Sequence, residues 1–152
     1  MTVDSHVHVL PDDLLIRAGR VVCPATGRDG PGAALVRGNR IVTVGDEIVG
    51  EARETLDFPD AMLLPGLVDM HAHPAHEASK YGIAPDTHIL PRGTTTDLSQ
   101  GDAGANNWPR YRESVIEGAR TRVRLAINLS APGESMPGGC FENLADVDVD
   151  AC

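Results

Sequence analysis

Short β-branched runs broken by glycine fill residues 13–63. Such runs are typical of strands, because a half-buried strand carries apolar side chains at every second position. The Gly38-Asn39 pair separates two of these runs with the spacing of a two-residue hairpin, which sets Val36 opposite Ile41. We therefore predict small antiparallel strands for the runs LLIR, RVV, AALVR, RIVTVG and ETLDF, buried in a β-sandwich or small barrel subdomain.

The pattern changes in residues 64–152 to strand, long loop, strand, helix and strand, which predicts parallel βα units. Strands are expected at Leu67–His73 and at Thr94–Ser99. A third strand is expected over 122–129, where aliphatic residues alternate with arginine, alanine and asparagine. The predicted fold class is therefore α/β with a β-rich subdomain ahead of the βα units.

Two helices are predicted in the same region. Asn107 and Pro109 suit the cap and the first turn of a helix, and apolar residues then recur at helical spacing. These apolar residues are Trp108, Tyr111, Val115 and Ala119. A second helix is expected from Glu142, again from apolar spacings of three and four, and it reaches Cys152 without a glycine cap. We expect the sequence to be interrupted there.

The composition of the 152-residue chain, 41% hydrophobic and 23% charged, is that of a globular protein. A formal net charge of -9 with scattered basic residues argues against a nucleic-acid footprint. No apolar run approaches the roughly 20 residues of a spanning helix, and the amino terminus lacks the pattern of an export signal. Three cysteines without CxxC spacing indicate neither a disulfide framework nor a zinc knuckle. We expect a cytoplasmic protein that binds neither nucleic acid nor membranes.

The segment LLPGLVDMHAHP carries the clearest chemistry in the chain. On a strand, residues two apart share a face, so Asp69, His71 and His73 are expected to point the same way. Two neutral imidazoles at a strand end can converge on one cation, and Zn²⁺ accepts histidine nitrogen at roughly 2.0–2.1 Å. The alternative is a chance HxH on a half-buried strand, with each histidine donating to a carbonyl. The preceding Pro-Gly, the aspartate on the same face and the position between two regions favour metal ligands.

These residues resemble the amidohydrolase superfamily, whose members carry PGLxDxHxH on the first strand of a (β/α)8 barrel and pair that TIM barrel with a small β-sandwich. The run GTTTDLSQGDAGANNWPRYRESVIEGARTRVRLAINLS, Gly93 to Ser130, is similar to the dihydroorotase-like amidohydrolase and deacetylase branch. The resemblance implies that residues 13–63 are the amino-terminal part of the sandwich. Residues 64–152 would be the first two to three βα units of an incomplete barrel.

The resemblance also assigns roles to single residues. It makes His71 and His73 metal ligands and Asp69 a supporting residue near them. Ser99 stands where this branch has a second-strand aspartate, so a role tied to that carboxylate is in doubt. The branch's other ligands are a lysine, commonly carbamylated, on the fourth strand, histidines on the fifth and sixth, and an aspartate on the eighth. A barrel needs about 250 residues, so these ligands cannot lie in this chain.

Other polar residues are weaker candidates. His6 and His8 repeat the HxH pattern without a Pro-Gly before it, and we expect residues 1–12 to be a mobile extension. His76 and His88 flank a polar loop and are expected at the surface. Lys80, the sole lysine, is expected to be a solvated loop residue.

Three residues near the ends of the second and third predicted strands are candidate substrate contacts. Gly101 and Gly104 could bring backbone N–H groups close to a substrate carbonyl, although a plain tight connection explains them equally well. Asn128 lies on the polar face of the third predicted strand. On this reading all three would contact the substrate.

The resemblance implies a metal-dependent amidohydrolase that acts on the carbon–nitrogen bond of an amide, either an N-acyl group or a cyclic amide. Its cofactor would be a divalent metal, zinc first, with one or two ions in a complete site. Its partner would be a small-molecule amide, and the complete enzyme would be a homo-oligomer. The alternative is a catalytically inactive fragment or a non-enzymatic binding module of the same fold. For these 152 residues alone we expect no turnover.

Overall fold

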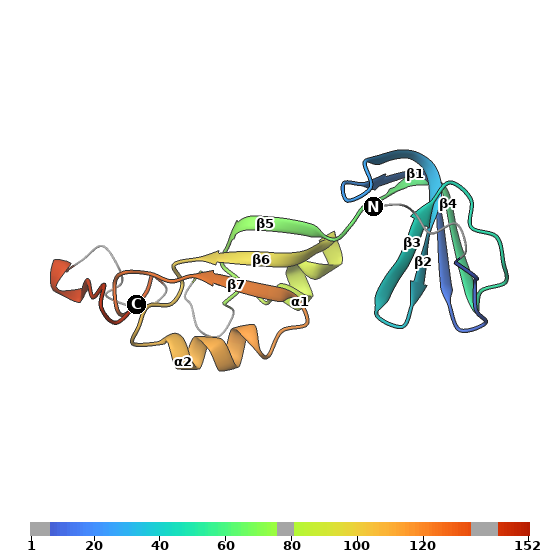
Figure 1. The fold of residues 1–152 in the computed structure, drawn as a ribbon. Coiled ribbons are helices and arrows are strands. Elements are labelled where there is room, and N and C mark those ends of the chain that lie inside the picture. Colours follow the sequence, from blue (N-terminus) through green and yellow to red (C-terminus); the bar gives the residue numbers. More distant parts are fainter. Residues whose placement is uncertain (1–6, 76–80, 135–142) are drawn as a thin grey trace. The chain divides into compact units, whose positions relative to one another are not determined.

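A computed structural model describes residues 7–75, 81–134 and 143–152. The chain divides into two compact units, Met1–Pro65 and Gly66–Cys152, which are described separately (Figure 1). None of the described helices is long and apolar enough to span a membrane.

The first unit contains a four-stranded sheet in the order β3-β2-β1-β4. Its strands are β1 (Leu14–Cys23), β2 (Arg28–Arg37), β3 (Arg40–Gly45) and β4 (Glu54–Leu63). The predicted hairpin is confirmed, because Val36 pairs with Ile41 across the turn. Gly38 takes φ 59° there, a left-handed conformation that glycine adopts without strain.

Two sequence-based expectations for this unit are corrected. The runs LLIR and RVV form one strand, β1, with a register irregularity near Gly19, where a side chain would collide with the carbonyl of Pro59. The strands are not all antiparallel, because β4 pairs parallel to β1. The segment after β3 carries the chain past β2 and β1 to the opposite edge, so β4 enters in the direction of β1. The described residues of this unit form one four-stranded sheet, and its place in a β-sandwich stays a prediction.

The core of the first unit holds Leu15, Ala33, Leu35 and Ile48. Val7 and Val9 pack against this cluster, so the described part of the predicted mobile extension is attached. The attachment continues at Asp13, whose buried carboxylate accepts hydrogen bonds from Arg37 and from the backbone N–H of Leu10. The Arg37 guanidinium is the main reason that the pKa of Asp13 lies below its usual value.

The second unit contains a parallel sheet in the order β5-β6-β7. The strands are β5 (Leu67–Ala72), β6 (Thr94–Gln100) and β7 (Arg122–Ala126). Short helical segments precede β6, namely α1 (Pro85–His88) and the 3-10 turn Leu90–Arg92. The predicted succession of parallel strands is confirmed, although β7 ends three residues before the predicted limit at residue 129.

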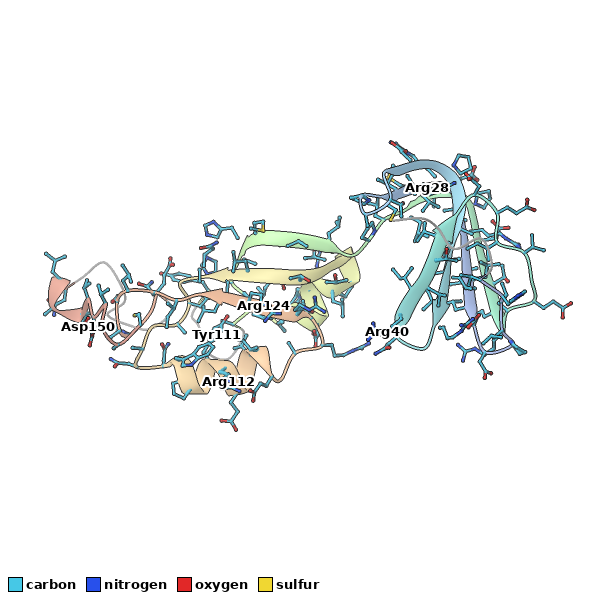
Figure 2. The ribbon with its side chains drawn as sticks, viewed as in Figure 1. Arg28, Arg40, Tyr111, Arg112, Arg124 and Asp150 are labelled. Atoms are coloured by element: carbon cyan, nitrogen blue, oxygen red, sulfur yellow. The ribbon has the colours of Figure 1, made fainter. Side chains whose placement is uncertain are left out.

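The predicted helix after the second strand is also present. It begins as α2 (Trp108–Tyr111) and continues as a π-helical turn over Arg112–Ile116, in which Glu117 N–H donates to the carbonyl of Arg112. Figure 1 shows α2 along one face of the sheet, and Figure 2 shows Tyr111 between helix and sheet. The core here comprises Ala75, Ala103, Tyr111, Val115 and Val123.

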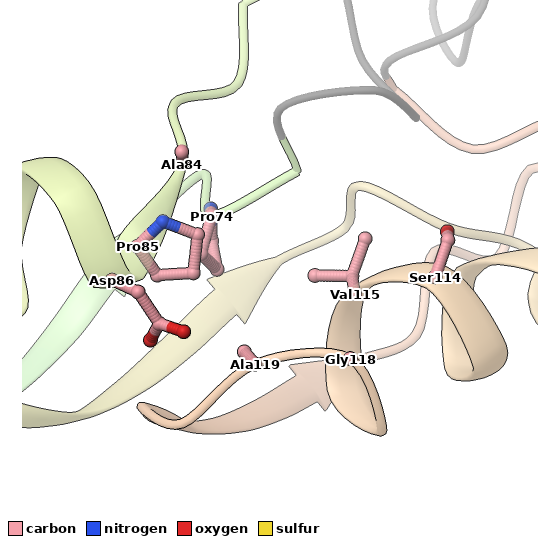
Figure 3. Close-up of a pocket in the computed structure, with 8 residues that line it drawn as sticks. All are labelled: Pro74, Ala84, Pro85, Asp86, Ser114, Val115, Gly118 and Ala119. Carbon is pink, nitrogen blue, oxygen red and sulfur yellow. The ribbon is translucent and has the colours of Figure 1, made fainter.

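Asp86 joins α1 to the start of β7. Its carboxylate accepts hydrogen bonds from the backbone N–H groups of Arg120 and Thr121 and from the Thr121 hydroxyl, at 2.7–2.8 Å. These donors hold its pKa below the usual value. A pocket of about 270 Å³ lies beside Asp86, with Pro85 on one side and Val115 on the other (Figure 3).

The helix predicted from Glu142 is wrong for the described residues 143–152. Only a 3-10 turn forms, Leu144–Asp146, and the Asn143 side chain caps it at Ala145 N–H. Val147 is extended and forms a β-bridge with Ser130. The β-bridge to Ser130 outweighs the weak helical periodicity of the apolar residues in this Val- and Asp-rich stretch.

Leu35 and Ile41 allow a matched test of the first unit. Leu35 is fully buried and Ile41 is 64% exposed. Leu35→Ala should lower the free energy of unfolding by about 2–5 kcal/mol, because it leaves a cavity. Ile41→Ala should change it by less than about 1 kcal/mol. Amide hydrogen exchange across β1 and β2 measures both, and equal losses would contradict the assigned core.

Candidate metal centre

The two motif histidines lie at the carboxyl end of β5. His71 is within the strand and His73 directly follows Ala72, its last residue. Their ring centroids are 5.7 Å apart with an interplanar angle of 63°. His71 is exposed, and the His73 side chain is 30% exposed. The carboxyl ends of parallel strands are where βα folds gather their chemistry, so both imidazoles lie at a suitable edge.

Asp69 is tied to the backbone of the same strand. Its Oδ1 accepts a hydrogen bond from His71 N–H at 3.0 Å. Asp69 also borders a pocket of about 370 Å³ that His88 and Arg92 help to line. Asp69 therefore braces the strand next to His71, and its supporting role toward a metal stays a prediction.

Asp102, which the sequence pattern did not single out, contacts His73. Its Oδ1 lies 2.8 Å from His73 Nδ1, and its Oδ2 accepts a hydrogen bond from Ser99 Oγ at 2.5 Å. Both Asp102 and Ser99 are fully buried. A signal was available in the sequence, because an acid follows three residues after the serine that stands in place of the branch's aspartate.

Asp97 is a second buried acid on β6. It is fully buried, and neither carboxylate oxygen has a hydrogen-bond partner among the described residues. It lies opposite Asp69 in the strand register. Burial raises the pKa of Asp97 to about 6, and the charge of Asp69 adds to the rise. Burial likewise raises the pKa of the Tyr111 phenol.

The three candidate substrate contacts are used within the protein. Gly101 N–H donates to the carbonyl of Ala126, and Gly104 N–H donates to Asn107 Oδ1. The Asn128 amide donates to the carbonyl of Gly101, and its oxygen accepts from Ser130 N–H. These bonds join the loop after β6 to the segment after β7. Contact of the three residues with substrate stays a prediction.

The remaining candidates that the structure describes add no ligand to this pair. His6, His76 and Lys80 lie outside the described residues. Within residues 7–75, 81–134 and 143–152, no three His, Cys, Asp or Glu side chains converge as a metal site. The donor chemistry of the pair still fits a metal such as zinc, because both groups are imidazoles and a carboxylate engages one of them at Nδ1.

The chain thus places HxH at the end of the first strand of a parallel βα sheet, after a separate β-rich unit. The chain is 31% identical over 116 residues to a deacetylase of Agrobacterium fabrum, covering 73% of this chain. It is 32% identical over 145 residues to an adenine deaminase of Deinococcus radiodurans, covering 86% of this chain. No protein-family model matches it.

Solved structures agree with these relatives. The crystal structure of a dihydroorotase matches with a TM-score of 0.77 and 28% identity, covering 92% of this chain and 38% of that one. The crystal structure of an adenine deaminase matches with a TM-score of 0.72 and 26% identity, covering 92% of this chain and 36% of that one. The chain belongs to the amidohydrolase superfamily. It spans 28% and 24% of the lengths of the two curated relatives above.

The raised pKa of Asp97 predicts how the stability of the second unit depends on pH. The folded state holds this proton more tightly than the unfolded chain, so the contribution of Asp97 to stability falls as pH rises from about 4 to about 6. The free energy of unfolding of Asp97→Asn, relative to that of wild type, should therefore rise by on the order of 2–3 kcal/mol between pH 4 and pH 7. Trp108 fluorescence reports urea unfolding of this unit.

The control for this experiment is Asp60→Asn, which changes an exposed aspartate. That variant should keep the wild-type dependence on pH. A difference between Asp97→Asn and wild type that stays constant across the same pH range would contradict the prediction.

Proposed function

We propose that the chain supplies the first two metal ligands of a metal-dependent amidohydrolase that hydrolyses the carbon–nitrogen bond of an amide. The observation that carries the proposal is the pair His71 and His73 at the end of β5, with Asp102 on the Nδ1 of His73. Zinc is the first choice of metal, because neutral imidazole is one of its preferred ligands. We further propose a cytoplasmic enzyme that is a homo-oligomer in its complete form.

A metal bound here would polarise the substrate carbonyl and lower the pKa of water from 15.7 to about 7. The residues of this chain have other tasks. His71 and His73 would hold the ion through unprotonated ring nitrogens, and Asp102 would accept a hydrogen bond from His73 Nδ1–H. Asp69 would keep the β5 backbone in place by accepting His71 N–H.

We also propose that the three-stranded sheet is the beginning of a (β/α)8 barrel and the first unit part of a β-sandwich. The parallel order β5-β6-β7 supports the barrel. Beyond β7, a groove of about 640 Å³ is lined by Trp108, Ile116, Leu125 and Ile127, where a following βα unit would pack. The likeness to a dihydroorotase over 38% of that protein's length also supports it.

An N-acyl amide is the favoured substrate class, with a cyclic amide as the second. The similarity to a deacetylase extends over 73% of this chain, whereas similarity to a dihydroorotase of Streptococcus pneumoniae, at 42% identity, covers 40%. The alternative function is a catalytically inactive fragment or a non-enzymatic binding module. We propose that these 152 residues alone are inactive, and this stays a prediction for the assay described below.

Zinc titration of the chain tests the ligand pair. His71→Ala and His73→Ala should each weaken zinc binding by about tenfold or more, because each removes one of two ligands. His88→Ala, which changes a histidine outside the pair, should leave the affinity unchanged. Isothermal titration calorimetry measures all three variants, and equal affinity of His71→Ala and wild type would refute the assignment.

An amidase assay tests the proposed inactivity. The zinc-loaded 152-residue chain should show no turnover of N-acetyl amino acids or dihydroorotate above that of His71→Ala. Two ligands leave the metal without the rest of its site, so no reactive arrangement forms. Turnover by wild type that disappears in His71→Ala would show that the chain alone is an enzyme.

A further inference from the structure

The ring of His73 is backed by a carboxylate that comes from a loop. Asp102 lies two residues after the end of β6, and its Oδ1 is 2.8 Å from His73 Nδ1. The second oxygen accepts a hydrogen bond from Ser99 Oγ, which β6 itself provides. One oxygen of the Asp102 carboxylate therefore contacts His73 Nδ1, and the other is held by Ser99.

The Asp102 carboxylate is fully buried, so its contact with His73 matters for stability. A buried ionised carboxylate is costly unless it is hydrogen-bonded or paired, and Asp102 has both kinds of partner. The Asp97 carboxylate, equally buried but on β6 itself, has no such partner among the described residues. The contact with His73 is thus a specific feature of Asp102 and not a general property of acids in this unit.

The loop that carries Asp102 is fastened on both sides. Gly101 N–H donates to the carbonyl of Ala126 at 2.9 Å, and Asn128 N–H donates to the carbonyl of Ala103 at 2.8 Å. Asp102 lies between these two attachments. Its side chain is therefore held in one place by the segment that follows β7, which limits the positions that the ring of His73 can take.

We propose that Asp102 is a positioning residue for His73, and that Ser99 holds Asp102 in place for this task. Asp102 accepts a hydrogen bond from His73 Nδ1–H, which fixes the Nδ1–H tautomer and leaves Nε2 unprotonated as the atom that binds a metal. This inference rests on the proposed function for its purpose, but the tautomer is a property of the chain without metal. The two can therefore fail separately.

A purely structural role of Asp102 makes a different prediction. An anchor for the loop would change stability when removed, but it would leave the tautomer of a half-exposed histidine free. Asp86 is such an anchor in the same unit, because its carboxylate binds Arg120 and Thr121. Asp86→Ala therefore provides a matched control that loses structural hydrogen bonds in which the ring takes no part.

Long-range ¹H–¹⁵N NMR of the histidine side chains tests the inference in the metal-free 152-residue chain. At about pH 8, His73 should be in the Nδ1–H tautomer. Asp102→Ala should abolish this preference, and Asp102→Asn, which keeps a carbonyl acceptor, should retain it. Asp86→Ala should lower the melting temperature and leave the tautomer unchanged. An Nε2–H tautomer in wild type, or an unchanged tautomer in Asp102→Ala, would overturn the proposal.

Zinc affinity gives a second readout. Asp102→Ala should weaken zinc binding by roughly 10–100-fold, and Ser99→Ala should weaken it in the same direction. If Asp102→Ala does not fold, the tautomer of His73 in wild type and the zinc affinity of Ser99→Ala still test the positioning role. An Nδ1–H tautomer without any zinc binding by wild type would support the positioning contact and overturn the proposed function. Unchanged affinity in both variants would overturn the positioning role.

Discussion

The pairing of β5 with β6 is the constraint on which the candidate site depends. Parallel pairing brings the carboxyl ends of neighbouring strands to one edge, and here that edge joins His73, after β5, to Ser99 and Asp102, at and after the end of β6. Antiparallel pairing of the same strands would separate these ends by the length of the sheet. The helix packed on one face supplies the apolar contacts of Tyr111 and Val115 that hold this sheet in place.

Asp97 on β6 and Asp102 in the loop after it show what burial does to a carboxyl group without and with partners. Ser99 and His73 accompany Asp102, whereas Asp97 is surrounded by groups that do not donate to it among the described residues, and its pKa rises to about 6. The second arrangement costs stability at neutral pH and has no function that we can assign. Two acids of equal burial thus differ in what they contribute, because hydrogen bonding decides the outcome.

Local sequence predicted the parts that local physics determines. The Gly38-Asn39 hairpin set the pairing of Val36 with Ile41, and the parallel strands around the HxH segment were found. The parallel pairing of β4 with β1 could not be predicted, since it follows from a crossing over the sheet and not from any residue in β4. The contact of Asp102 with His73 joins residues far apart in sequence, so it depends on the fold. The failed helix near Val147 shows a bridge to Ser130 outweighing a weak periodicity.

The hydrogen bonds between the loop after β6 and the segment after β7 have a consequence for protein engineering and for evolution. Asn128 alone contributes its backbone N–H and its side-chain amide to Ala103 and Gly101. Neither segment can be exchanged by itself without stranding donors or acceptors of the other. The two segments therefore depend on each other, and a new loop surface is best made by grafting both together.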